Sequence, residues 1–360
     1  MGVEIKLTDK QFPVSPVFID FLHRRIEDKA FEATWHDQLS EKLVSNQGEI
    51  REVAQAAAGT VLDSPLGQQA VYRSYELLTA MLTGAPDKLR FFHDRYRFVC
   101  VVGCPRHGGS YLTKQLFLAL GMVPDEVPNV LAHDGFPEAA PFEFKEGVNT
   151  QTLMTQNMAE YLAMVEVFFA DSRLHNNYVT VPKKATKAAY QGAFFNAMLG
   201  PHAEYIVTLR HPVAACISTY EKSGGLPDDG KFKVRGNIEE WASRDNVLAG
   251  VAPETVLASD YFDVYLRYWE NYHYQLALSG LSRNRNWTMV VYGKERMMEL
   301  AQSFFARFRS KGQAEEFQVF DKRDRHPEWR PRAEAAMRRV AGVWRSVGLG
   351  FPIDAMMEGW

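Results

Sequence analysis

A glycine-rich segment of the chain has the residue types of a loop that binds phosphate or sulfate. Backbone N–H groups at a strand-to-helix turn point toward an anion, and the positive end of the helix dipole adds to the attraction. Arg106 brings a fork of donors into the segment, which suits one terminal phosphate or sulfate. A plain glycine turn is the alternative for the segment taken alone. The segment is Gly103-Cys104-Pro105-Arg106-His107-Gly108-Gly109-Ser110.

The spacing of this segment is close to that of a Walker A loop, with one difference. Gly109 stands where such a loop has the lysine that reaches the β- and γ-phosphates of a nucleoside triphosphate. The replacement of that lysine argues against an ATPase.

A second candidate site follows another apolar run. Arg210 comes directly after residues 205–209, and open α/β sheets bind ligands at the carboxyl ends of their strands. Ser218 lies eight residues further on (218 − 210), about two turns of a helix with 3.6 residues per turn, so its hydroxyl faces the same cleft. We predict that Arg210 and Ser218 share one phosphate. For this pair in isolation, the alternative is a surface ion-pair arginine and an ordinary helix serine.

The elements that must position these residues alternate along the chain. Residues 98–102 form a short apolar run typical of a strand buried on both faces. Residues 205–209 read as a second strand and residues 287–292 as a third apolar run, and a helical pattern follows each of the three. This alternation predicts an α/β fold, a three-layer sandwich with a central parallel sheet of the P-loop-like type. Between residues 15 and 92 the apolar spacing is helical. We therefore divide the chain into an N-terminal helical region, 1–95, and an α/β domain, 96–360.

Composition narrows the class of protein. A formal net charge of −3 provides no overall positive field for nucleic acid. Three cysteines are too few and too scattered for a disulfide framework, and no run approaches the roughly 20 apolar residues of a membrane span. The first residues lack the pattern of a signal peptide. We expect a cytoplasmic protein with no membrane span, no nucleic-acid partner and no metal site, and the sequence leaves a homo-oligomer open.

Together the two candidate sites resemble those of the sulfotransferase family that uses 3′-phosphoadenosine 5′-phosphosulfate (PAPS). The family's 5′-phosphosulfate loop is similar to residues 105–111, and its 3′-phosphate motif is similar to Arg210-His211-Pro212 followed by Ser218. Further similarities are Tyr268-Trp269 in an aromatic helix and Val290-Val291-Tyr292 before Lys294-Glu295. The resemblance extends from about residue 98 to the C-terminus and does not cover the first 95 or so residues.

The resemblance implies a role for each matched residue. The 5′-phosphosulfate would be held by the loop, Arg210 and Ser218 would hold the 3′-phosphate, and residues 96–360 would form the sulfotransferase domain. The loop residues expected to contact the cofactor are Arg106, His107, Gly108, Gly109, Ser110 and Tyr111.

Two departures from the family pattern are visible. Cytosolic members commonly have a lysine in the first loop, where this chain has Arg106 and His107. A glycine-rich C-terminal nucleotide motif has no close match, and we predict that Arg323 and Arg325 clamp the nucleotide instead. A solvated charge cluster explains this basic loop equally well. Its residues are Lys322, Arg323, Arg325, His326 and Arg330.

The general base is the least defined part of the site. Many cytosolic members place a histidine after a lysine, whereas residues 181–186 here keep Lys183 and Lys184 and lack histidine. We expect Lys183, with Lys184 as the alternative, to neutralise charge on the leaving group. Glu143 is our first choice of base because its apolar neighbours would raise its pKa, and His107 is a rival. The other candidates are His133, Asp134 and Glu138.

The expected activity is the in-line transfer of a sulfuryl group from PAPS to a hydroxyl acceptor, with release of adenosine 3′,5′-bisphosphate. Such chemistry depends on positioning and on cations near the leaving group, and it needs no metal. The expected catalytic residues are Arg106, His107, Glu143 and Lys183, and the acceptor is a small molecule or a lipid. The alternatives are a P-loop kinase or NTPase and a nucleotide-binding protein without catalytic activity.

Overall fold

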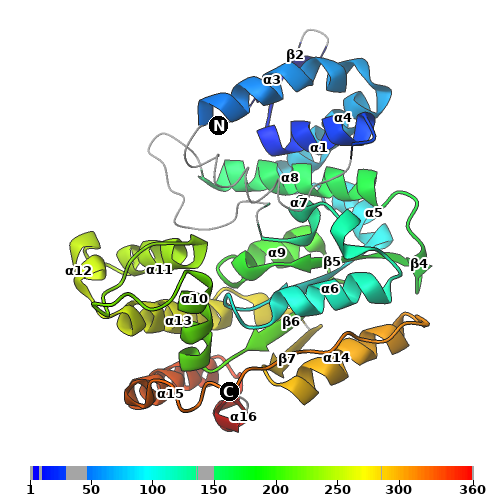
Figure 1. Cartoon of the computed structure of the whole chain (residues 1–360). Coiled ribbons are helices and arrows are strands. Elements are labelled where there is room, and N and C mark those ends of the chain that lie inside the picture. The colour runs from blue at the N-terminus through cyan, green and yellow to red at the C-terminus, as the bar shows by residue number, and fades with distance from the viewer. Residues whose placement is uncertain are drawn as a thin grey trace.

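The computed structural model describes residues 3–7, 10–29, 47–134, 136, 150–284 and 286–358 of the 360-residue chain. A five-stranded sheet with the order β4-β5-β3-β6-β7 lies at its centre (Figure 1). Four strands are parallel, and β4 pairs antiparallel with β5 at one edge. The expected α/β fold with a mostly parallel sheet is therefore confirmed. The strands are β3 (Tyr96–Val102), β4 (Leu174–His175), β5 (Tyr178–Lys184), β6 (Glu204–Leu209) and β7 (Trp287–Val291).

Helices cover both faces of this sheet. Successive residues of a strand point to opposite faces, and in β3 Phe98 and Cys100 join one hydrophobic cluster while Val99 and Val101 join the other. Helices α6 (Gly109–Ala119) and α14 (Lys294–Arg307) pack on the Val99 side. The helices on the other face are α8 (Thr150–Phe168), α9 (Gly192–Leu199), α10 (Pro212–Lys222) and α13 (Tyr261–Leu278).

The N-terminal part is mainly helical, as expected, but it begins with strands. β1 (Val3–Leu7) and β2 (Lys10–Val14) form an antiparallel ribbon. The helical pattern starts only at Ser15, and the sequence before it alternates apolar and charged residues with the period of a strand. The helices are α1 (Pro16–Ile26), α3 (Gln47–Asp63), α4 (Pro65–Thr83) and α5 (Pro86–Arg95).

Helices α1 and α4 pack on α8, and α3 packs on α1 and α4 in turn (Figure 1). Arg73 of α4 donates two hydrogen bonds to the Glu166 carboxylate of α8, at 2.7 and 2.9 Å. The Ser15 amide donates to Glu160 of α8 at 2.9 Å. The expected boundary at residues 95 and 96 coincides with the end of α5 and the start of β3, yet one hydrophobic cluster continues across it.

The remaining helices and 3-10 turns lie between the elements already given or follow α14. None of the helices in the described parts of the chain is long and apolar enough to cross a membrane. These elements are α7 (Asn129–Ala132), α11 (Asn237–Leu248), α12 (Pro253–Ala258), α15 (Arg330–Ser346), α16 (Ile353–Glu358) and the 3-10 turns Pro124–Glu126, Thr186–Ala189, Leu281–Arg283 and Pro327–Trp329.

Candidate functional site

The two predicted anion-binding segments lie at the point where the strand order reverses. From β3 the chain crosses to β5 on one side, and β6 then pairs with β3 on the other side. Ligands of open α/β sheets bind at such a switch point, outside the carboxyl ends of the strands. The glycine-rich loop follows β3 and Arg210 follows β6, so the topology brings the two segments together.

The glycine-rich loop turns tightly into α6. Arg106 and Gly108 have φ angles of 70° and 88°, in the left-handed region that favours glycine. Arg106 is thus held in a strained conformation, with its side chain exposed. Ser110, in the first turn of α6, is also exposed. The loop therefore presents one guanidinium and one hydroxyl beside the N-terminus of a helix, where an anion is stabilised.

Arg210 is a buried cation whose partners are all neutral. Its side chain is 4% exposed, and its Nη1 donates to the Arg106 carbonyl at 2.8 Å and to the Ser218 hydroxyl at 3.0 Å. The guanidinium lies 3.8 Å from the centre of the Tyr292 ring. Its Nε has no hydrogen-bond partner among the described residues. Burial lowers the pKa of Arg210 and Arg106 acts in the same direction, whereas Tyr292, Tyr265 and the charge of Glu221 oppose the shift. A buried charge that no described carboxylate bonds directly is costly, so this position fits a bound anion.

The cations of the basic loop at residues 322–325 pair with two different carboxylates. Lys322 is 6% exposed and, with Arg325, donates to the Glu221 carboxylate at the end of α10. Burial lowers the pKa of Lys322, and nearby Arg210 acts in the same direction, which places the two cations within electrostatic reach of each other. Arg323 instead bonds the exposed Asp321 carboxylate. Lys322 and Arg325 thus share Glu221 on α10, the helix that carries Ser218, while Arg323 pairs with Asp321. The clamp role of Arg323 and Arg325 stays a prediction.

A cluster of three aromatic rings adjoins the loop. Tyr111 donates to the Glu315 carbonyl at 2.7 Å, and its ring lies 4.6 Å from the Phe317 ring. Phe317 in turn lies 5.1 Å from Tyr292, the ring on which Arg210 stacks. A side chain at Gly108 would contact both Tyr292 and Phe317. Tyr292 was visible in the sequence at the end of a predicted strand, whereas Phe317 lies in an irregular segment that carries no comparable signal.

His107 lies behind the loop rather than in front of it. Its ring is 1% exposed, and its Nδ1 donates to the Thr208 carbonyl at 3.1 Å. Burial holds the pKa of His107 well below its usual value, with nearby His273 acting in the same direction. The ring thus faces β6 rather than the open side of the loop, and the predicted roles of His107 as a base and a cofactor contact stay predictions.

The two adjacent lysines of β5 face opposite sides of the sheet. Lys183 is 2% exposed, and its Nζ donates to the carbonyls of Leu131, His133 and Phe136 at 3.3, 2.9 and 2.7 Å. Burial lowers the pKa of Lys183 to about 7. Lys183 therefore secures α7 and the segment after it, and the catalytic role predicted for this lysine stays a prediction.

Lys184 is the lysine that faces the loop. A side chain at Gly109 would lie 3.6 Å from Lys184 Cε, so this lysine passes beside the start of α6. Its Nζ forms an ion pair with Asp134 at 3.0 Å. Lys184, which the sequence analysis gave as the alternative to Lys183, is therefore the lysine whose position suits charge neutralisation near the loop.

Among the carboxylates that the sequence offers as the general base, Asp134 is the one that lies within the described residues. Its Oδ2 accepts from the Thr186 hydroxyl at 2.8 Å, and its Oδ1 accepts from the Thr186 amide. Burial raises the pKa of Asp134, but Lys184, His133 and the hydrogen bonds outweigh burial and hold it below its usual value. Asp134 is therefore ionised and fixed beside Lys184. Glu143, our first choice, and Glu138 lie outside the described residues.

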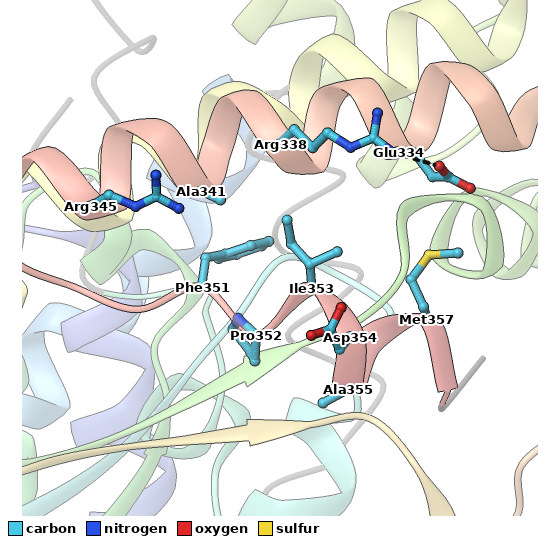
Figure 2. Close-up of a pocket in the computed structure, with 10 residues that line it drawn as sticks. All are labelled: Glu334, Arg338, Ala341, Arg345, Phe351, Pro352, Ile353, Asp354, Ala355 and Met357. Atoms are coloured by element: carbon cyan, nitrogen blue, oxygen red, sulfur yellow. Dashed lines mark hydrogen bonds and ion pairs between the residues drawn. The ribbon is translucent and has the colours of Figure 1, made fainter.

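A separate groove lies between α15 and α16, with a volume of about 690 Å³ (Figure 2). Phe351, Ile353 and Met357 project into it toward α15, and Arg338 of α15 pairs with Glu334 at 3.0 Å. None of its lining residues belongs to the two anion-binding segments. The groove is therefore not the candidate anion site.

The described part of the chain contains no cluster of three or more His, Cys, Asp or Glu side chains placed to hold a metal ion. Comparison with protein-family models, with curated proteins and with solved structures gives no match. The geometry of the site and the sequence motifs therefore carry the functional argument.

Proposed function

We propose that this protein is a sulfotransferase that transfers a sulfuryl group from PAPS to a hydroxyl acceptor. The fold would then be a P-loop-like three-layer sandwich. The helices on both faces of the sheet and the loop between β3 and α6 support that assignment. A small molecule or a lipid is the proposed acceptor.

The observation that carries the proposal is the environment of Arg210. Its guanidinium is buried against Ser218, Tyr292 and the Arg106 carbonyl, with no carboxylate bonded to it among the described residues. A phosphate placed here would supply the missing negative charge. Because Arg210 bonds the loop itself, this pocket and the pocket at Arg106 adjoin each other. Two adjacent anion pockets fit a nucleotide with one anionic group at each end of its ribose.

The described residues divide between the two ends of such a nucleotide. Arg106, Ser110 and the start of α6 would hold the 5′-phosphosulfate, and Arg210 with Ser218 would hold the 3′-phosphate. Tyr111, which is half-buried beside the loop and packs on Phe317, would stack on the adenine, since aromatic rings stack on bases. Lys322 would add charge at the 3′ end, with Glu221 neutralising it when no nucleotide is bound.

Lys184 and Asp134 are the residues that we propose to act at the site of sulfuryl transfer. The new bond joins the acceptor oxygen to sulfur, and the bond between sulfur and the 5′-phosphate oxygen breaks. Lys184 and Arg106 would neutralise the charge that develops on that phosphate oxygen. Asp134 would orient Lys184, because its ion pair and hydrogen bonds lower its pKa and make it a weak base. Glu143 stays the predicted base that takes the proton from the acceptor hydroxyl.

Ligand-dependent thermal unfolding tests the cofactor. A ligand that binds only the folded state stabilises it by about 2.7 kcal/mol at a hundred times its Kd. We expect adenosine 3′,5′-bisphosphate to raise the Tm clearly, and ATP, GTP and adenosine 5′-monophosphate to raise it less. The Arg210→Ala variant should lose the extra shift, whereas Arg338→Ala on α15 should keep it. Equal shifts with ATP and the bisphosphate would count against the proposal.

Transfer itself needs a second measurement. Incubation with PAPS labelled in its sulfuryl group, together with a panel of phenols, sterols and sugars, should give a labelled product. The Lys184→Met variant should still bind the bisphosphate but form product more slowly. Binding of the bisphosphate without labelled product from any acceptor class would favour a nucleotide-binding protein that lacks catalysis.

A further inference from the structure

Two hydrogen bonds cross in opposite directions between the phosphate loop and the end of β6. Arg210 Nη1 donates from the β6 side to the Arg106 carbonyl at 2.8 Å. His107 Nδ1 donates from the loop side to the Thr208 carbonyl at 3.1 Å. A carbonyl oxygen only accepts, so Nδ1 carries the hydrogen of a neutral His107 ring. The two segments that form the anion pockets are thus tied to each other at two points.

The packing around these bonds leaves the segments little room to move apart or closer. A Cβ atom at Gly103 would lie 1.9 Å from the Thr208 hydroxyl oxygen and 2.9 Å from the Thr208 carbonyl oxygen. Only a residue without a side chain permits this approach of β3 to β6. The His107 ring fills the next space along the same seam, where it is 1% exposed.

One face of α13 supports both ties from below. Trp269 and His273 are one helical turn apart, and their rings lie 4.1 Å from each other. Trp269 Nε1 donates to the Arg210 carbonyl at 3.3 Å, and the His273 ring lies 5.6 Å from the His107 ring. The groove-lining Phe351 packs on the same two residues at 6.1 and 5.7 Å. The backbone of Arg210 and the ring of His107 therefore rest on one rigid support.

We infer that His107 is a positioning residue that sets the separation between the two anion pockets, so that one nucleotide can occupy both. This inference rests on the proposed function and adds the residue that adjusts the site to a doubly charged ligand. His107 contacts no nucleotide in this role. It acts through the Thr208 carbonyl, two residues before Arg210.

Nucleotides with one and with two anionic groups distinguish this role from ordinary fold stabilisation. The benefit of joining two contacts in one ligand depends on the match between its length and the spacing of the sites. In calorimetric titrations we expect His107→Leu to weaken adenosine 3′,5′-bisphosphate binding about tenfold. Adenosine 5′-monophosphate and adenosine 3′-monophosphate each occupy one pocket, so their affinities should change by less than about twofold. His107→Asn keeps an N–H near the Nδ1 position and should recover most of the bisphosphate affinity.

Two further variants secure the result. Trp269→Phe removes the donor to the Arg210 carbonyl but keeps an aromatic ring, so it should give the same selective loss even if His107→Leu does not fold. His93 of helix α5 is the matched control, since it is a histidine whose Nε2 also bonds a backbone carbonyl, that of Met198, at 2.8 Å. His93→Leu should leave the ratio of bisphosphate to monophosphate affinity unchanged.

The outcomes separate this inference from the proposed function. Bisphosphate binding that is unaffected in His107→Leu and Trp269→Phe, or equal losses for all three nucleotides, would overturn the positioning role alone. Failure of the wild-type protein to bind the bisphosphate would overturn the proposed function, and the positioning role with it.

Discussion

Neighbouring lysines on β5 show how much one residue step changes a side chain's task. Lys183 pairs with Cys100 in the sheet register and points toward the α8 face, while Lys184 pairs with Val101 and points toward α6. The first satisfies three backbone carbonyls, and the second joins Asp134 beside the phosphate loop. The sequence shows two equivalent lysines, and only the strand register separates the lysine that backbone carbonyls hold from the lysine beside the glycine-rich loop.

Replacing each lysine by methionine tests this division. We expect Lys183→Met to lower the free energy of unfolding by about 2 kcal/mol, because buried carbonyls lose their donor. Bisphosphate affinity should change little. Lys184→Met leaves the Asp134 carboxylate without its partner in a pair whose side chains are only 18% and 16% exposed, so it should also cost about 2 kcal/mol or more, but sulfuryl transfer should slow in this variant alone. Urea unfolding and labelled-PAPS assays on both variants check the pattern, and the reverse pattern would assign the catalytic task to Lys183.

The unit formed by β3, the loop and α6 depends on a glycine at the seam with β6. Gly103 lies against Thr208 so closely that any side chain must push the two strands apart. Gly109, six residues later at the start of α6, has ordinary space around it, since the nearest atoms to an added Cβ are 3.6 Å away. Gly103 is therefore required by the close approach of β3 to β6, whereas the position of Gly109 has room for a side chain.

Alanine substitutions at the two positions test this difference in available space. Gly103→Ala should destabilise the protein by about 1–3 kcal/mol through overpacking and should weaken bisphosphate binding, because the two pockets separate. Gly109→Ala should stay within about 0.5 kcal/mol of the wild type. Urea midpoints at constant m-value give the comparison. Equal stabilities for the two variants would show that β3 and β6 have more room than the structure indicates.

The elements that the sequence predicted best are those with a clear period. The strands predicted at residues 98–102, 205–209 and 287–292 correspond to β3, β6 and β7, although Thr288 and Met289 of the edge strand β7 are exposed. β5 was missed because it contains Pro182 and two lysines, which are unusual in a central strand. The pairing of Arg210 with Ser218 followed from helical spacing, and the structure places them 3.0 Å apart. The enclosed position of His107 did not follow, because burial depends on α13, a distant part of the chain.

At the scale of the whole molecule, the N-terminal helices are joined to the sheet domain through α8. Glu160 of α8 accepts hydrogen bonds from the amide and the hydroxyl of Ser15, the residue that caps α1. Gln156 donates to the same carboxyl at 3.0 Å. Glu160 is 1% exposed, so a titrating group lies inside the contact between the two parts of the chain.

This contact should make stability depend on pH. Burial raises the pKa of Glu160 from 4.5 to about 7, although Ser15 and Gln156 oppose the shift. The folded state therefore binds a proton that the unfolded state has lost between these two values. Its contribution is complete below pH 4.5 and disappears as the pH rises through about 7, which is worth up to about 3 kcal/mol.

Urea unfolding of the wild type and of Glu160→Gln across that range measures the effect. The glutamine variant cannot titrate, so we expect the stability difference between the two proteins to shift toward the variant as the pH rises. Asp20 and Asp245, whose pKa values burial raises to about 6, contribute the same trend to both proteins and cancel in the difference. Parallel pH profiles would show that Glu160 does not gain a proton on folding, and that the α1–α8 contact is held by its apolar packing alone.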